Sequence, residues 1–258
     1  MFVHINRCPD ENLSTRVLGL PSINISSLSA STKNLLHRAE IVSFDGLQGD
    51  CQNVIRNIIR AIGGMNDLTI LELKSCLETE CFLDNTSHQV DVELPMLVRL
   101  YLEDMKNLKE VCRGPPPLGF FEKLIEFRLF RCPQLHNIFP RECKLPNLKF
   151  LTIGRYVKSN VVSCRAAALF SISVARSLTQ LEELSINYIE ELKQIISEED
   201  DGDDMKTEII PTSHSSHLIF PYLKRLFVSY CDKLEYIFPI SCVEGLKQLQ
   251  KIKIFSLS

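Results

Sequence analysis

One pattern, C-x-x-L-x-x-I-F-P, occurs twice in the chain, as CPQLHNIFP at 132–140 and as CDKLEYIFP at 231–239. The cysteine and the apolar positions are the same in both copies, whereas the polar positions differ. A catalytic site needs only one copy of itself, but a stacked scaffold needs the same apolar positions in every unit. The pattern therefore predicts a chain that is built from structural repeats.

Each copy is preceded by a second pattern, L-x-x-L-x-L or a close variant of it, and this pattern recurs along the chain. The successive units begin at Ala39, Leu68, Leu97, Leu124, Leu148, Leu181, Leu223 and Leu249. The intervals are 29, 29, 27, 24, 33, 42 and 26 residues, and five of them lie within or beside the range of leucine-rich repeats. A weaker copy places Leu20, Ile23 and Ile25 at the same positions.

The alternation x-L-x-L predicts a short strand in each unit, because successive side chains of a strand point to opposite faces. We therefore expect an α/β leucine-rich-repeat solenoid, or horseshoe, over residues 1–258, with about eight to ten irregular repeats. Its concave side is a parallel sheet and its convex side is irregular or helical. The residues predicted to point inward are Leu100, Phe127, Leu151, Leu184 and Leu226.

Two segments outside the expected strands have helical patterns, and a third is strongly polar. Apolar residues recur at helical spacing in 51–62, and Gly63 and Gly64 follow as a stop. Residues 161–178 are also expected to form a helix. The segment 197–217 begins with SEEDDGDD and is predicted to be a flexible acidic insertion.

The chain lacks the motifs of the common catalytic and nucleotide-binding sites. It has no G-x-x-x-x-G-K-[ST], no G-x-G-x-x-G, no G-x-S-x-G and no H-E-x-x-H. SEEDDGDD lacks the alternating spacing of a calcium loop, and His214 and His217 have no evident second pair of ligands. No histidine accompanies both Cys132 and Cys231. We therefore predict no enzyme activity, no cofactor and no metal.

Net charge and hydropathy restrict the cellular compartment and the classes of partner that we expect for this chain. The formal net charge is −3, which gives no general reason to expect nucleic acid or an anionic membrane as the partner. The N-terminal residues lack the apolar core of a secretory signal, and no stretch approaches the length of a membrane span. The ten cysteines form no C-x-x-C pair, so we expect free thiols in a cytoplasmic protein.

The outward positions of the predicted strands combine large aromatic residues with arginines, which are enriched at protein interface hot spots. The candidate binding residues are Arg99, Tyr101, Arg128, Phe130, Phe150, Tyr156, Tyr188, Arg225, Phe227, Tyr230 and Phe255. Other outward positions hold Glu126, Lys251 and Lys253. We predict a concave protein-binding surface, although some aromatic residues could merely cover the sheet or face a neighbouring domain.

The unit from Phe220 to Pro239 resembles the C-terminal leucine-rich repeats of plant nucleotide-binding immune receptors, above all their coiled-coil class. The segment LLHRAEIVSFDGL at 35–47 is similar to the entry into their later repeats. The resemblance implies a sensor that binds a pathogen effector, or a host protein altered by one. It also implies that the repeats hold the receptor inactive by packing on its nucleotide-binding domain.

The ends of the chain and two other protein classes bear on this interpretation. The first unit is cut at Met1 and the last strand ends at Ser258 without a polar cap, so we expect a fragment that lacks the nucleotide-binding module. One alternative is the substrate-recruiting repeats of an F-box-type ubiquitin ligase, whose units are more even in length. The other is a cysteine-dependent enzyme, which would need one thiol with a depressed pKa.

Overall fold

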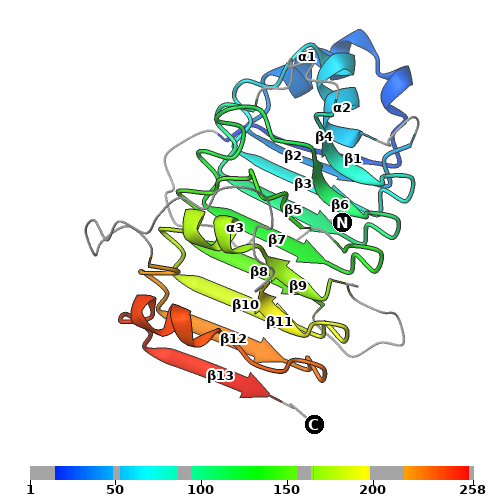
Figure 1. The fold of residues 1–258 in the computed structure, drawn as a ribbon. Helices are drawn as coiled ribbons and strands as arrows, with labels where there is room; N and C mark the ends of the chain where they lie inside the picture. Colours follow the sequence, from blue (N-terminus) through cyan, green and yellow to red (C-terminus); the bar gives the residue numbers. More distant parts are fainter. Residues whose placement is uncertain are drawn as a thin grey trace.

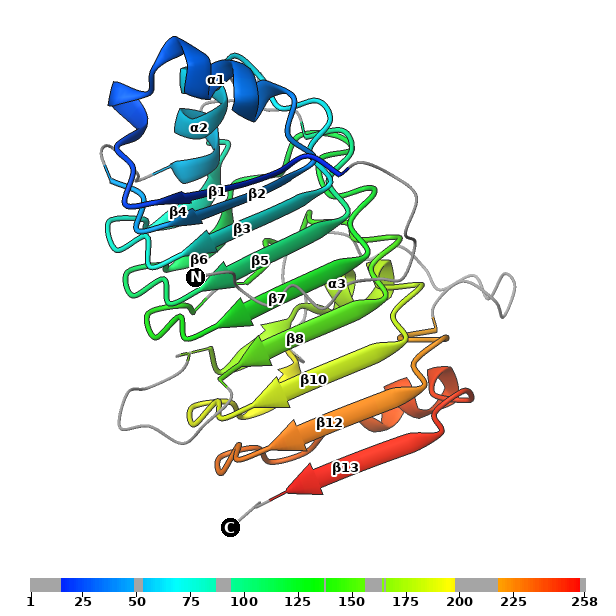
Figure 2. The same ribbon diagram turned by 180° about the vertical axis from the view of Figure 1, so that it is seen from behind.

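The repeat units form one stacked parallel sheet. The computed structural model describes residues 15–48, 53–86, 94–136, 138–155, 164, 166–197 and 218–255, without the side chains of 241–243. Nine strands lie side by side in the order β1-β2-β3-β5-β7-β8-β10-β12-β13, which Figure 1 shows from one side and Figure 2 from the other. Their bounds are β1 Val17–Pro21, β2 Ile41–Asp45, β3 Ile70–Lys74, β5 Arg99–Glu103, β7 Glu126–Phe130, β8 Phe150–Gly154, β10 Glu183–Asn187, β12 Arg225–Ser229 and β13 Lys251–Phe255. The predicted leucine-rich-repeat fold is confirmed.

The register of this main sheet aligns the repeat positions of neighbouring units. Leu100 pairs with Phe127, Phe127 with Leu151, and Leu184 with both Leu151 and Leu226. All five of these side chains are fully buried, as the alternation predicts. Each inward side chain therefore contacts the equivalent position of the next unit, and stacking buries a core that a single unit could not enclose.

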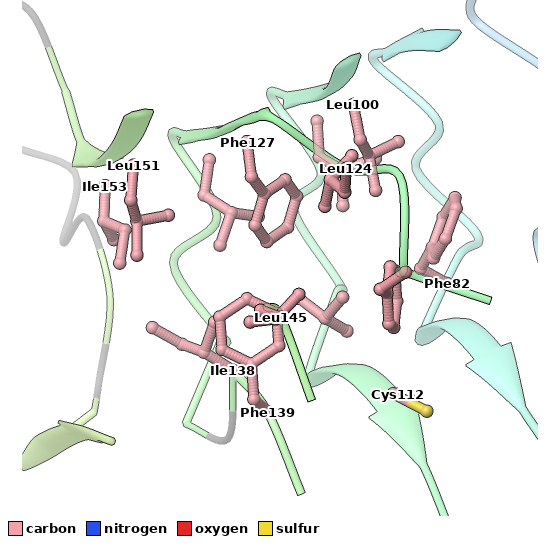
Figure 3. Packing of buried hydrophobic residues seen from close by; sticks show 14 of the residues in the cluster. Phe82, Leu100, Cys112, Leu124, Phe127, Ile138, Phe139, Leu145, Leu151 and Ile153 are labelled. Carbon is pink, nitrogen blue, oxygen red and sulfur yellow. The ribbon is translucent and has the colours of Figure 1, made fainter. Parts of the chain in front are cut away.

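The core lies between the main sheet and the returning segments on the other side of the solenoid. Figure 3 shows Phe127 and Leu124 on the sheet side, with Phe139 and Ile138 opposite them. The rings of Phe127 and Phe139 lie 5.5 Å apart between their centroids, and Phe139 stacks on Phe170 at 6.5 Å. The aromatic residues thus continue the core from one unit to the next.

Two short ladders and several helices form the convex side. Strand β4 pairs with β6, and β9 pairs with β11. These strands are β4 Cys81–Asp84, β6 Glu110–Arg113, β9 Ala168–Phe170 and β11 Gln194–Ile196, and the helices are η1 Ile25–Ser27, α1 Ala30–His37, α2 Val54–Ile62, α3 Ile172–Ser177 and η2 Ile240–Gly245. In the view of Figure 2, α3 lies behind the main sheet, and α1 and α2 lie at the β1 end of the stack, so none of them covers its outer face.

The structure settles two of three expectations about individual segments. Helix α2 confirms the helical pattern of 51–62 over its described part, and Gly63 ends it in a left-handed conformation with φ 89°. The predicted helix 161–178 is wrong in its middle, because 168–170 pair with β11 and the helix begins only after its N-cap, Ser171. The acidic insertion lies outside the described residues from 198 to 217.

The first strand begins earlier than its repeat pattern suggests. Parallel pairing with β2 aligns Leu18 with Val42 and Leu20 with Phe44, whereas the pattern assigns the strand positions to Ile23 and Ile25. Ile25 instead begins a 3-10 turn, because the Asn24 side chain accepts a hydrogen bond from the Ser26 N–H at 2.9 Å. Local capping competes here with strand formation.

Each described strand of the main sheet from β3 to β12, except β8, is followed by a residue with positive φ. These residues are Ser75, Asp104, Arg131, Tyr188 and Tyr230, with φ between 51° and 57°. Their backbone N–H groups donate to the carbonyl of the next strand, as Tyr188 N does to Ser229 O at 2.8 Å. The left-handed residue thus extends the ladder by one hydrogen bond before the chain turns inward.

Buried cysteines follow three of these turns. Cys76, Cys132 and Cys231 donate their thiols to the carbonyl two residues earlier, at sulfur–oxygen distances of 3.3, 3.4 and 3.5 Å. All three side chains are buried. The cysteine of the repeat is therefore a small core residue that satisfies a turn carbonyl, as the sequence predicts.

Candidate protein-binding surface

The outer face of the main sheet consists of the first, third and fifth residues of each strand and the turn residue that follows. The structure places nine of the eleven candidate residues there as partly or fully exposed side chains: Arg99, Tyr101, Arg128, Phe150, Tyr188, Arg225, Phe227, Tyr230 and Phe255. Tyr156 lies outside the described residues. Phe130 is buried, with 5% exposure, although its position predicts an exposed side chain. Its neighbours in register are Glu103 on β5 and Gly154 on β8.

Glu126 connects three of the candidate residues on the N-terminal half of this face. Its carboxylate accepts a hydrogen bond from the Tyr101 hydroxyl at 3.0 Å and pairs with Arg99 at 3.4 Å and with Arg128. The Arg128 guanidinium also lies 5.1 Å from the centroid of the Tyr101 ring. Burial of the phenol, followed by the Glu126 charge, raises the pKa of Tyr101. Tyr101 is therefore a protonated donor that Glu126 holds in place.

A second group of charges continues this arrangement across β3, β5 and the turn after β7. Lys74 pairs with Glu72 at 2.9 Å and with Glu103 at 3.4 Å. Arg131 pairs with the same Glu103 at 3.0 Å and with Asp104 at 3.7 Å. Together with the pairs of Glu126, these contacts engage four carboxylates and four cations. We call these eight residues on β3, β5, β7 and their turns the N-terminal charge network.

Strand β8 separates this network from the rest of the sheet and carries no charge on its outer face. Its outward residues are Phe150, Thr152 and Gly154. Gly154 has φ 133°, and a Cβ atom at this position would lie 1.8 Å from the Asn187 carbonyl oxygen. Only glycine fits this close approach of β8 and β10.

The C-terminal strands carry a different combination of side chains. Arg225 pairs with Glu183 at 2.6 Å, and the Lys251 ammonium lies 5.6 Å from the centroid of the Phe227 ring. Lys253 lies beside Phe227 in register. We call the outer face of β10, β12 and β13, with the turn residues Tyr188 and Tyr230, the cationic–aromatic patch.

The two turn tyrosines of this patch stack on each other. Their ring centroids are 4.3 Å apart and their planes differ by 10°. The Arg155 guanidinium lies 5.2 Å from the Tyr188 centroid and pairs with Glu190 at 2.8 Å. Three planar groups therefore form a row along the carboxyl ends of β8, β10 and β12. Tyr230 is 38% exposed at the end of this row, and Phe255 is 53% exposed on β13.

The described cysteines lie in the core, and no metal-ligand group accompanies the outer face among the described residues. The seven described cysteines are buried free thiols, and burial raises the pKa of Cys231 to about 11 and that of Cys81 to about 12. No group of His, Cys, Asp or Glu side chains suited to a metal ion occurs in the described part of the chain. The residues His214 and His217 lie outside it.

Spacing in the sequence does not reveal the charge pairing on this face. It places Glu126, Lys251 and Lys253 at outward positions but assigns them no role in binding. Glu126 and Arg99 are separated by 27 residues in the sequence, and only the register of β5 and β7 brings them together. Their equivalent repeat positions were a signal that could have identified the pair.

Comparison with known proteins identifies the repeats. The family described as plant disease resistance protein RPS2-like, leucine-rich repeats, matches residues 29–190 and 207–257. No curated protein and no solved structure matches the chain at a significant level. Among the described residues, no helix has the length and apolar character that crossing a membrane requires.

Proposed function

The chain belongs to the RPS2-like family of leucine-rich repeats from plant disease resistance proteins, and we propose that it is the protein-recognition module of an intracellular immune receptor. The repeats of this family are protein-interaction modules. The proposed ligand is a pathogen effector or a host protein that an effector has altered. The proposal also includes packing of the repeats on a nucleotide-binding domain, which would keep the receptor inactive without ligand.

One observation carries this proposal. The outer face of the main sheet presents Arg128 on β7 and Phe227 on β12 at the same level of the register, with β8 and β10 between them, and Tyr230 directly after β12. No described helix covers this face. Arginine and aromatic side chains contribute disproportionately to binding at protein interfaces. Neighbouring strands lie about 4.8 Å apart, so a protein ligand can contact several units at once.

The test begins with pairwise screening of candidate effectors and host proteins against the full chain, followed by calorimetry of a confirmed pair. We expect Arg128→Ala, Phe227→Ala and Tyr230→Ala to weaken binding at least about fivefold each, since interface anchors contribute more than about 1 kcal/mol. Lys106→Ala and Glu142→Ala change exposed residues away from the outer face and serve as matched controls. The melting temperature shows whether each variant is folded.

Two results would contradict the proposal. In one, the controls weaken binding as much as the three outer-face variants. In the other, the outer-face variants bind like the parent protein, which would assign recognition to another surface of the solenoid. Either result would leave the repeat fold unchanged, because none of these side chains belongs to the buried core.

A further inference from the structure

We propose that the cationic–aromatic patch binds an acidic segment of a protein partner. This inference rests on the proposed recognition function and names the chemistry of the ligand for one part of the outer face. Three cations, Arg225, Lys251 and Lys253, occur on β12 and β13, against the single carboxylate of Glu183 on β10. The patch therefore has a local excess of positive charge, although the whole chain has a net charge of −3.

The pairing of Glu183 leaves this excess on β13. Glu183 is bound to Arg225 at 2.6 Å, and no ion pair joins Lys251 or Lys253 to a carboxylate within the described residues. Both lysines are exposed. They are two residues apart on one strand, so their side chains leave the same face about 7 Å apart. This separation suits neighbouring acidic side chains of an extended segment.

The N-terminal charge network shows why the same ligand is not expected there. Its cations already contact carboxylates of the chain, with Lys74 between Glu72 and Glu103 and Arg99 on Glu126. An acidic ligand would have to displace these carboxylates and would be repelled by them. The two halves of the outer face share residue types but differ in charge balance, and this difference directs an acidic segment to β12 and β13.

The aromatic residues of the patch add a second requirement for the ligand. Tyr230 and Phe255 are 38% and 53% exposed. Phe255 follows the two lysines on β13, and Tyr230 directly follows the neighbouring strand β12. Covering such rings contributes apolar contact area that a purely acidic segment cannot supply. We therefore expect acidic residues with an aromatic or apolar residue close by in the partner sequence.

A nucleic acid would also combine negative charge with stacking, but the cation count disfavours it. Nucleic-acid binding draws its affinity from many simultaneous phosphate contacts. The patch offers three cations, and Arg225 is already engaged by Glu183. The two lysines without a carboxylate partner among the described residues match a short acidic segment better than a phosphate backbone.

The test measures fluorescence anisotropy of labelled ligands with the full chain at low ionic strength. The probes are a short peptide of alternating Glu and Tyr, its Gln–Tyr counterpart, and a single-stranded oligothymidylate of equal length. We expect saturable binding of the Glu–Tyr peptide, about tenfold weaker binding of the Gln–Tyr peptide, and loss of the difference in high salt.

Charge reversal locates the site. We expect K251E/K253E to weaken binding of the Glu–Tyr peptide at least about tenfold, whereas K106E/K144E, with the same change in net charge, stays within about twofold. K251Q/K253Q gives an intermediate loss and replaces the first variant if the melting temperature shows that it does not fold. Equal losses in the two charge-reversed pairs would overturn the inference, as would equal binding of the two peptides or tighter binding of the oligothymidylate.

A confirmed protein partner separates this inference from the proposed function. If Arg128→Ala weakens partner binding and K251E/K253E does not, the recognition function stands and the acidic-segment site is wrong. If neither variant, nor Phe227→Ala or Tyr230→Ala, changes binding, the recognition function of the outer face itself is wrong. Loss with K251E/K253E but not with K106E/K144E supports both.

Discussion

The two halves of the outer face, the N-terminal charge network and the cationic–aromatic patch, have the same backbone structure but differ in how their charges are paired. In the N-terminal half, Glu126 and Glu103 each contact at least two cations, so the network neutralises itself. In the C-terminal half, Lys251 and Lys253 face outward beside aromatic rings. The comparison teaches that a regular scaffold can hold one region fixed by internal pairing while it leaves another region open to a ligand.

The first and largest effect is expected when the buried core that supports both halves is disrupted. Leu184 is fully buried on β10, and Leu184→Asp is expected to reduce the free energy of unfolding by about 4 kcal/mol or more, because it buries an unpaired charge. Urea denaturation measures the loss. The matched change Ser185→Asp adds the same charge to the outer face of the same strand and should cost about 0.5 kcal/mol or less. Similar losses would mean that the inward and outward positions are assigned wrongly.

The second test concerns β8, the strand that lies between the two halves. Gly154→Ala is expected to destabilise the protein by about 3 kcal/mol, since a Cβ atom would lie 1.8 Å from the Asn187 oxygen and φ is 133°. Gly19→Ala is the control, because a Cβ atom there meets no atom within 4 Å. Denaturant unfolding compares both variants with the parent. A Gly154→Ala protein as stable as Gly19→Ala would show that the strands are not so close at this position.

The third test compares one carboxylate from each half. Glu126→Ala removes the partner of Tyr101, Arg99 and Arg128 and is expected to cost about 2 kcal/mol of unfolding free energy, because its side chain is only 13% exposed. Glu183→Ala removes one partner from an Arg225 that is 38% exposed and should cost less than about 1 kcal/mol. Equal costs would remove the proposed distinction between a structural network and an open patch.

The smallest effect is expected inside the solenoid, where the two halves do not differ. Replacement of Cys8, Cys51 and Cys242 by serine leaves seven buried thiols. Because burial raises the pKa of Cys231 to about 11 and that of Cys143 to about 12, little reactive thiolate exists near neutral pH. We expect negligible labelling by a disulfide reagent at pH 7 and labelling of all seven thiols in denaturant. One rapidly reacting thiol in the native protein would instead favour the cysteine-enzyme hypothesis.

The sequence predicts the inward positions of the main sheet better than the structure of the convex segments. The inward residues follow one rule, alternation of apolar and other side chains, so Phe127 and Leu184 could be placed from spacing alone. The convex segments follow no such rule. Residues 168–170 are apolar in a manner compatible with a helix, and only pairing with β11 makes them a strand.

The candidate site was predictable as a set of positions but not as a set of contacts. Phe130 and Phe227 occupy outward positions, yet only Phe130 is buried, because exposure depends on what the neighbouring strands contribute at that level. The role of Glu126 likewise depends on residues from the preceding strand. Such contacts follow from register, which spacing in the sequence suggests but does not establish.

The distance between neighbouring strands limits how the side chains of an extended ligand can align with the repeat units. Strands recur about every 4.8 Å, whereas side chains on one face of an extended peptide recur about every 6.8 Å. A peptide that crosses the strands at a right angle therefore falls out of step with the repeat units within a few residues, so its side chains cannot each occupy the equivalent position of successive units. For such a ligand, selectivity comes from a few separated contacts, so the ligand sequence need not repeat with the period of the strands.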